Sequence, residues 1–173
     1  LFTPDEEGRA IWVVPFAGGV PAQIMEGGGF ALSPRGDRIA FSRGRDLMEL
    51  PLAEGAEPRR LARLRGGASG LAWSPDGSDL AFVSNRGDHS FVGVYDGDRA
   101  EVRYVAPSVH HDGNPVWSPD GRRIAFLRIP NERVVHMFAP RREALPFSIH
   151  VADAAGTTST EVWKADPGVG SAF

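Results

Sequence analysis

A 14-residue segment occurs three times in this chain of 173 residues, at 30–43, 71–84 and 115–128. Each copy places a serine and a proline just before a turn glycine and follows the turn with an apolar triplet. The serine falls at positions 33, 74 and 118, so the copies are 41 and 44 residues apart. A spacing of about 40–45 residues is that of a four-stranded propeller blade.

The residue types around the repeated serine predict a tight turn between two strands. Pro75 fixes φ for the first central position of the turn. Gly77 supplies the left-handed residue that lets the strands pair again, as in a type I turn followed by a bulge. The Ser74 hydroxyl is expected to bond back to the turn backbone. The third copy repeats these residue types at 118–121.

The apolar triplets after the turns predict strands that are covered on both faces. Ile39-Ala40-Phe41, Leu80-Ala81-Phe82 and Ile124-Ala125-Phe126 are continuously apolar and do not alternate with polar residues. Blades packed face to face supply this cover, and the central alanine lets a neighbouring sheet approach closely. An ordinary β-sandwich with chance turns is the alternative, and three matching copies disfavour it.

We therefore expect an all-β fold, a β-propeller segment of about 3.5–4 four-stranded antiparallel blades in an incomplete ring. Such an arc leaves apolar faces open, so we infer that the natural protein is longer or that copies of this chain associate to close the gap. The expected divisions are a partial first blade at 1–27, three blades at 28–66, 67–110 and 111–169, and the start of another at 170–173.

Composition excludes some functions and leaves others open. The formal net charge of -3 and the pI of about 6.0 argue against a nucleic-acid partner. The absence of cysteine excludes disulfides and thiolate metal sites. No apolar run approaches the roughly 20 residues of a membrane span. The start at Leu1 indicates a fragment or a chain from which a signal peptide was removed.

The repeats resemble those of a known group of proteins. Trp73-Ser74-Pro75-Asp76-Gly77 followed by Leu80-Ala81-Phe82, and the matching segment at 117–126, are similar to the WD-repeat-like blades of TolB and of the prolyl oligopeptidase family of serine peptidases. Further stretches resemble bacterial relatives of dipeptidyl peptidase IV, and these favour the peptidases. They are 84–95, 111–117 and 146–153, the last of which runs on into 161–166.

The peptidase resemblance implies a propeller that restricts access and helps to bind peptide for an α/β-hydrolase domain of the same longer chain. That domain carries a Ser-Asp-His triad, but this sequence has no Gly-x-Ser-x-Gly nucleophile elbow. We therefore expect no catalytic residue and no cofactor in this chain. The alternative is a TolB-like periplasmic propeller that acts as a protein-interaction scaffold. The resemblance favours a periplasmic or secreted location, with the cytoplasm left open.

The best candidate for substrate binding is the insertion between Arg128 and Ser148, because the corresponding connections in the earlier blades are only a few residues long. In relatives of dipeptidyl peptidase IV, a propeller excursion supplies acidic residues that hold the free amine of the peptide. Glu143 is the candidate for that role, and Arg141 and its neighbour Arg142 are candidates for gripping a carbonyl or carboxylate. Solvated charges on a surface loop are the alternative.

Arg86, Asp88 and His89 are candidates for lining the face of the ring or contacting a second domain. With Ser90 they include the residue types of a catalytic triad, but triads are assembled from distant segments and not from one loop. The adjacent His110 and His111 point to opposite faces of a strand, so we expect no metal site there.

The remaining conspicuous residues have structural explanations. The arginines at 59, 60, 63 and 65 lie on an outer strand and its exit, where positive charge protects an exposed edge from pairing. Trp73 and Trp117 recur at one repeat position, which favours core packing over ligand stacking.

Overall fold

The computed structural model describes residues 10–14, 18–26, 28–131 and 146–165, and these form strands and turns without a helix. The all-β prediction is confirmed. Within this part of the chain there is accordingly no helix that could span a bilayer. The strands are β1 (Ala10–Val13), β2 (Ala22–Glu26), β3 (Gly28–Leu32), β4 (Arg38–Arg43), β5 (Asp46–Pro51), β6 (Arg59–Arg63), β7 (Ala68–Trp73), β8 (Asp79–Asn85), β9 (Ser90–Asp96), β10 (Glu101–Val105), β11 (His111–Trp117), β12 (Arg123–Ile129), β13 (Ser148–Asp153) and β14 (Ser159–Lys164).

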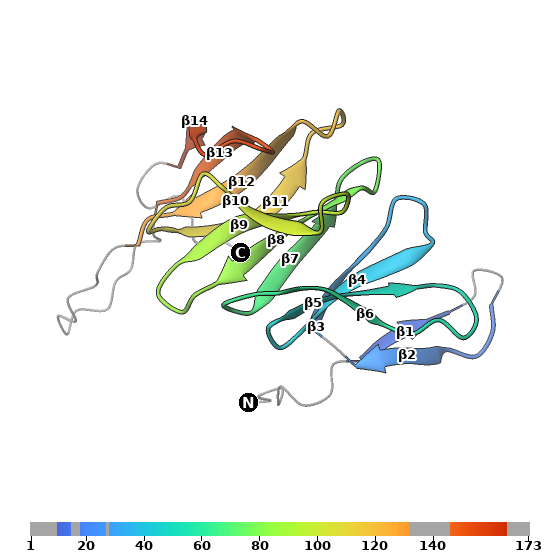
Figure 1. The fold of residues 1–173 in the computed structure, drawn as a ribbon. Coiled ribbons are helices and arrows are strands. Elements are labelled where there is room, and N and C mark those ends of the chain that lie inside the picture. The colour runs from blue at the N-terminus through green and yellow to red at the C-terminus, as the bar shows by residue number, and fades with distance from the viewer. Residues whose placement is uncertain (1–9, 15–17, 27, 132–145, 166–173) are drawn as a thin grey trace, which may run out of the picture.

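The strands form antiparallel meanders that lie side by side like the blades of a fan (Figure 1). We call β3–β6, β7–β10 and β11–β14 the second, third and fourth blades, and β1 with β2 the first pair. The third and fourth blades are joined by one parallel bridge between Ser90 and His111, and the Ser90 hydroxyl donates to the Asp112 carbonyl over 2.7 Å. The blade boundaries expected from the sequence, at 1–27, 28–66, 67–110, 111–169 and 170–173, stay a prediction.

The repeated turns have the predicted chemistry. Gly77 adopts a φ of 76°, and Gly36 and Gly121 both adopt 69°, so each glycine is in the left-handed region. The Ser74 hydroxyl accepts the Asp79 backbone N–H at 2.9 Å and donates to Asp76 at 2.6 Å. This bond from Ser74 is the main reason that the pKa of Asp76 falls to about 2.

The second blade reaches the same turn with its carboxylate in another place. Arg35 stands where the other copies have aspartate, and Asp37 lies two residues later. The Ser33 hydroxyl donates to Asp37 over 2.7 Å, and this bond is the first cause of the lowered pKa of Asp37. In all three turns the repeated serine therefore donates to a nearby carboxylate, which lies at one of two positions after the serine.

In the third blade, alternate residues of the apolar triplet pack against different blades, as continuous apolarity predicted. In the third blade, Leu80 and Phe82 are fully buried against the second blade, where they meet Ala40. Ala81 points the other way and packs with Ile124 and Phe126 of the fourth blade. Each interface thus sets the small alanine of one blade against the large side chains of the next.

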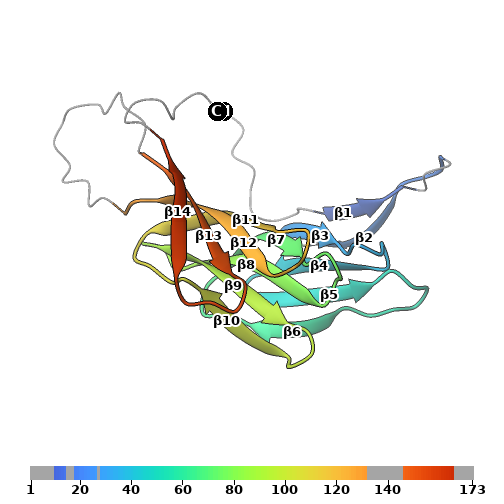
Figure 2. The ribbon, with the colours of Figure 1, turned by 90° about the horizontal axis from the view of Figure 1, so that it is seen from above.

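A tryptophan hydrogen bond repeats across both of these interfaces. Trp73 Nε1 donates to the carbonyl of Ala31 at 3.1 Å, and Trp117 Nε1 donates to the carbonyl of Ala72 at 2.9 Å. Both tryptophans are half-buried against a hydrophobic core, so the preference for packing over ligand stacking agrees with their place in the fold. The inner strands β3, β7 and β11 are therefore held together in sequence (Figure 2).

Enlarging the alanine tests this packing. We expect Ala81→Leu to lower the free energy of unfolding by about 1–3 kcal/mol, because the added methyl groups meet Ile124 and Phe126 in a closed interface. Ala125→Leu is the matched control, since Ala125 is only half-buried and faces away from the third blade. It should cost under about 0.5 kcal/mol. Urea unfolding of the two variants measures the difference, and equal losses would contradict the assignment of faces.

Candidate functional site

The strand connections lie on two opposite rims. We call the rim with the serine-proline turns, residues 33–38, 74–79 and 118–123, the turn rim. The other is the hairpin rim, which carries residues 86–89 between β8 and β9 and residues 106–110 between β10 and β11. Antiparallel meanders place alternate connections at opposite ends, so the connection from β12 to β13 also starts on the hairpin rim.

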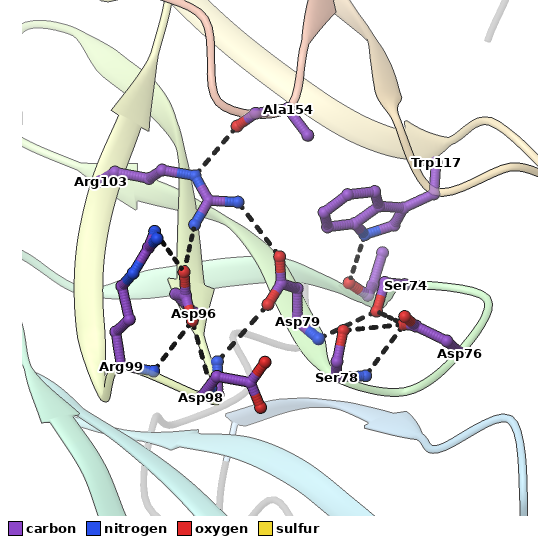
Figure 3. Close-up of polar contacts among 12 residues, drawn as sticks. Ser74, Asp76, Ser78, Asp79, Asp96, Asp98, Arg99, Arg103, Trp117 and Ala154 are labelled. Atoms are coloured by element: carbon purple, nitrogen blue, oxygen red, sulfur yellow. Dashed lines mark hydrogen bonds and ion pairs between the residues drawn. The ribbon is translucent and has the colours of Figure 1, made fainter.

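Most polar groups of the turn rim bond within their own turn or blade, and Arg103 in addition links two blades (Figure 3). Arg103 bonds to Asp79 at 3.1 Å and to Asp96 at 3.3 Å, and its Nε donates to the Ala154 carbonyl of the fourth blade at 3.1 Å. The pKa of Asp96 is lowered first by the backbone N–H of Arg99 and further by the nearby arginines. The network is a structural link between two blades.

A cavity of about 180 Å³ opens on the turn rim between the second and third blades. Its charged lining is also internally paired, because the nearly buried Glu49 lies 3.1 Å from Arg38 Nε and 2.5 Å from Arg59 Nη2. Arg38 in addition covers the indole of Trp73, with 4.8 Å between its guanidinium carbon and the ring centroid, and donates to the Gly77 carbonyl. We therefore place the candidate site on the hairpin rim.

Arg86 holds a small aromatic cluster at the hairpin rim. Its Nη2 donates to the Tyr104 hydroxyl over 2.6 Å, and its guanidinium carbon lies 5.4 Å from the Tyr104 ring and 5.7 Å from that of Phe91. His89 meets Phe91 edge to face at 4.7 Å. Arg86 therefore connects the β8–β9 hairpin to Tyr104 on β10, a contact that the sequence alone did not indicate.

Asp88 is the exposed part of this site, and His89 beside it is half-buried. The Asp88 carboxylate is 82% exposed and lies 2.6 Å from His89 Nδ1. The Ser90 hydroxyl, in contrast, is buried and bonded to the Asp112 carbonyl, so it is turned away from His89. This arrangement suits hydrogen bonding to a partner and provides no activated nucleophile.

Asn131 connects the third and fourth blades at the same place. Its side-chain amide donates to the Asp88 carbonyl at 2.7 Å, and its backbone N–H donates to His110 Nδ1 at 3.1 Å. The sequence places Asn131 in the insertion between Arg128 and Ser148 and does not predict either contact. The other candidates of that insertion, Arg141, Arg142 and Glu143, lie outside the described residues, so their role stays a prediction.

The surroundings of His110 and His111 are described only in part, because residues 132–145 lie outside the described residues. Among the described residues, no three His, Cys, Asp or Glu side chains gather around a position that could hold a metal ion. His110 accepts a hydrogen bond through Nδ1, and His111 begins β11. The neighbouring Asp112 is buried and pairs with Arg128, at 2.7 Å to Nε and 2.9 Å to Nη2.

His150 makes the stability of the fold depend on pH. Its ring stacks on Phe126 at 5.7 Å, and the Ser148 and Ser159 hydroxyls each lie 3.0 Å from a ring nitrogen. Burial is the main cause of its lowered pKa, with the positive charge of Arg128 next. Nearby Glu161 and Asp112 act in the opposite direction.

The fold therefore favours neutral His150 more than the unfolded chain does. Its contribution to stability is complete above the unfolded pKa of about 6.5 and is lost as the pH falls below that value. We expect His150→Gln to lose less stability than the wild type when the pH is lowered from about 7.5 to about 5. Urea midpoints across this range measure the slopes, and parallel slopes would contradict the assignment.

Comparison with known proteins agrees with this architecture. No protein-family model matches the chain. A solved structure of a putative TolB from Agrobacterium tumefaciens has a TM-score of 0.69 and 22% identity, and the match covers 92% of this chain and 58% of that one. The β-propeller domain of the Trilobed protease from Pyrococcus furiosus has a TM-score of 0.63 and 16% identity, covering 89% of this chain and 49% of that one.

The chain is a β-propeller segment. A curated relative, the uncharacterised peptidase YuxL of Bacillus subtilis (strain 168), is 40% identical over 53 residues, which are 30% of this chain and 8% of the relative. The segment thus spans 58% of the TolB-like structure and a small part of that peptidase. Both groups of the sequence resemblance, TolB-type propellers and peptidase propellers, are present among its structural neighbours.

Proposed function

We propose that this segment is the non-catalytic propeller portion of a serine peptidase of the prolyl oligopeptidase type. In this role the blades restrict access to an α/β-hydrolase domain and help to bind its peptide substrate. The observation that carries the proposal is the 40% identity with a peptidase over 53 residues. The sequence itself has no Gly-x-Ser-x-Gly motif, so another domain must supply the nucleophile.

The hairpin rim is the proposed contact with the catalytic domain or its substrate. Asp88 presents an exposed carboxylate there beside the half-buried His89, while Arg103 on the turn rim is paired with Asp79 and Asp96. Asn131 ties the start of the long β12–β13 connection to the same hairpin. Arg141, Arg142 and Glu143 keep their proposed role in gripping a peptide. A periplasmic or secreted location accompanies this proposal.

Active-site labelling tests the proposal. A polypeptide that carries this segment, captured from its native cells with an antibody against the segment, should react with a serine-directed fluorophosphonate. Heat-denatured protein is the control for labelling that does not depend on an active site. Absence of specific labelling in the intact polypeptide would overturn the peptidase proposal.

A TolB-like interaction scaffold is the second candidate, supported by a match that extends over 92% of the chain. It predicts an unlabelled polypeptide that co-purifies with a partner protein. Self-association through open blade faces is a separate prediction, which light scattering tests by giving the solution mass. A monomer would exclude it.

A further inference from the structure

Four arginines gather at the hairpin-rim end of the second blade. The β4–β5 hairpin contributes Arg43 and Arg45, and the end of β6 contributes Arg63 and Arg65. The two segments are neighbours, because the Leu64 N–H donates to the Arg45 carbonyl at 2.8 Å and Asp46 lies opposite Arg63 in the sheet. All four side chains belong to exposed residues. We call this set the arginine patch.

The arginine patch has no carboxylate partner among the described residues, in contrast to the arginines that precede it on β6. Arg59 is bound to Glu49, and Arg60 lies 3.8 Å from Asp46. None of the patch arginines takes part in an ion pair within the described ranges. The guanidinium carbon of Arg43 lies 5.5 Å from the centroid of the Phe41 ring. This stacking leaves the N–H edge of the guanidinium available to a bound carboxylate.

The blade architecture does not require this charge. The corresponding exit from the third blade, after β10, has Ala106 and Pro107, and its hairpin carries a single arginine, Arg86, which donates to the Tyr104 hydroxyl. Like charges that are crowded together without partners destabilise a fold. Edge protection explains a scattered arginine, but it does not explain four at one end of one blade when the next blade forms without them.

We propose that the arginine patch binds an acidic, carboxylate-rich segment of a separate protein chain. Guanidinium groups match carboxylates through paired hydrogen bonds, and arginine is enriched at protein interfaces. A nucleic acid is disfavoured because the chain carries a net charge of -3, and a strand running along this rim would meet the exposed Asp88 carboxylate. The proposal concerns the second blade and is independent of peptidase activity.

Binding of a fluorescein-labelled oligoglutamate peptide to the full chain tests the proposal by anisotropy at low salt. We expect measurable binding that weakens as salt is added. The variant with Gln at all four patch positions should bind about tenfold or more weakly. The corresponding four-Lys variant keeps the charge but loses the paired geometry, and we expect an intermediate affinity.

The matched control removes the same number of charges from exposed arginines on the turn-rim end of the blades. Its substitutions are Arg35→Gln, Arg99→Gln, Arg122→Gln and Arg123→Gln. We expect this variant to keep most of the affinity. Equal losses in both variants would show a simple dependence on net charge and overturn the proposal, as would no binding by the wild type. Tighter binding of a single-stranded oligonucleotide of equal charge would overturn it in favour of nucleic acid. Unfolding midpoints confirm that each variant is folded.

Discussion

Replacing Asp112 with asparagine is expected to lower the free energy of unfolding by about 3–5 kcal/mol. The Asp112 carboxylate is fully buried and binds Arg128, whose side chain is only 13% exposed. Asparagine keeps the shape of the side chain but leaves the Arg128 charge without a counterion. Arg128 retains its bond to the Ala106 carbonyl, which does not replace a negative charge. Urea unfolding at neutral pH measures the loss.

Two further variants separate the ion pair from simple loss of packing. Arg128→Met leaves the Asp112 carboxylate buried without a counterion. We expect the double variant Asp112→Asn/Arg128→Met to be more stable than the sum of the two single changes predicts. The pair of Arg99 and Asp96 is the control, because the Arg99 side chain is 75% exposed and Asp96 keeps Arg103 as a partner when Arg99 is replaced. Arg99→Met should cost under about 1 kcal/mol. A loss that small for Asp112→Asn would show that the buried pair has no special weight.

Phe82→Ala should have an effect of similar size, about 3–5 kcal/mol, because the ring is fully buried between the second and third blades. Phe82 lies opposite Gly93 on the neighbouring strand and covers its backbone. A Cβ at Gly93 would come within 2.6 Å of the Phe82 ring. Gly93→Ala alone is therefore expected to destabilise the fold by overpacking.

The same geometry predicts compensation when both residues change. Once the ring has been removed, a methyl group at Gly93 fills part of the space, so Phe82→Ala/Gly93→Ala should be less damaging than the two effects added together. Phe30→Ala is the control for loss of a phenyl ring, since Phe30 is 58% exposed. Thermal or urea unfolding decides the comparison, and strict additivity would contradict the contact between ring and glycine.

The local parts of this fold could be predicted from the sequence because each is determined by a few neighbouring residues. A serine, a proline and a glycine at fixed spacing specify the turn, and the left-handed φ of Gly77 and Gly121 agrees with that chemistry. The triplet around Ala81 likewise indicated cover on two faces. What it did not indicate was which neighbouring blade each side chain meets.

The candidate site was less predictable because its contacts join residues that are far apart in the chain. Arg86 meets Tyr104 across the width of a blade, and Asn131 reaches Asp88 in a different blade. These contacts depend on the relative position of packed sheets, for which no short sequence pattern exists. Arg59 and Arg63 illustrate the same point, since they stand at the two ends of one strand and look alike in sequence, but of the two only Arg59 forms an ion pair among the described residues.

The bond from each tryptophan to the preceding blade gives the array a direction. One side of a blade offers an alanine and a carbonyl, and the other side offers a phenyl ring and, in the third and fourth blades, an indole N–H. Two copies of this chain can therefore reproduce the native interface only head to tail, which is a heterologous contact, and not back to back. A designer who wishes to extend or circularise the array must add units with the same polarity.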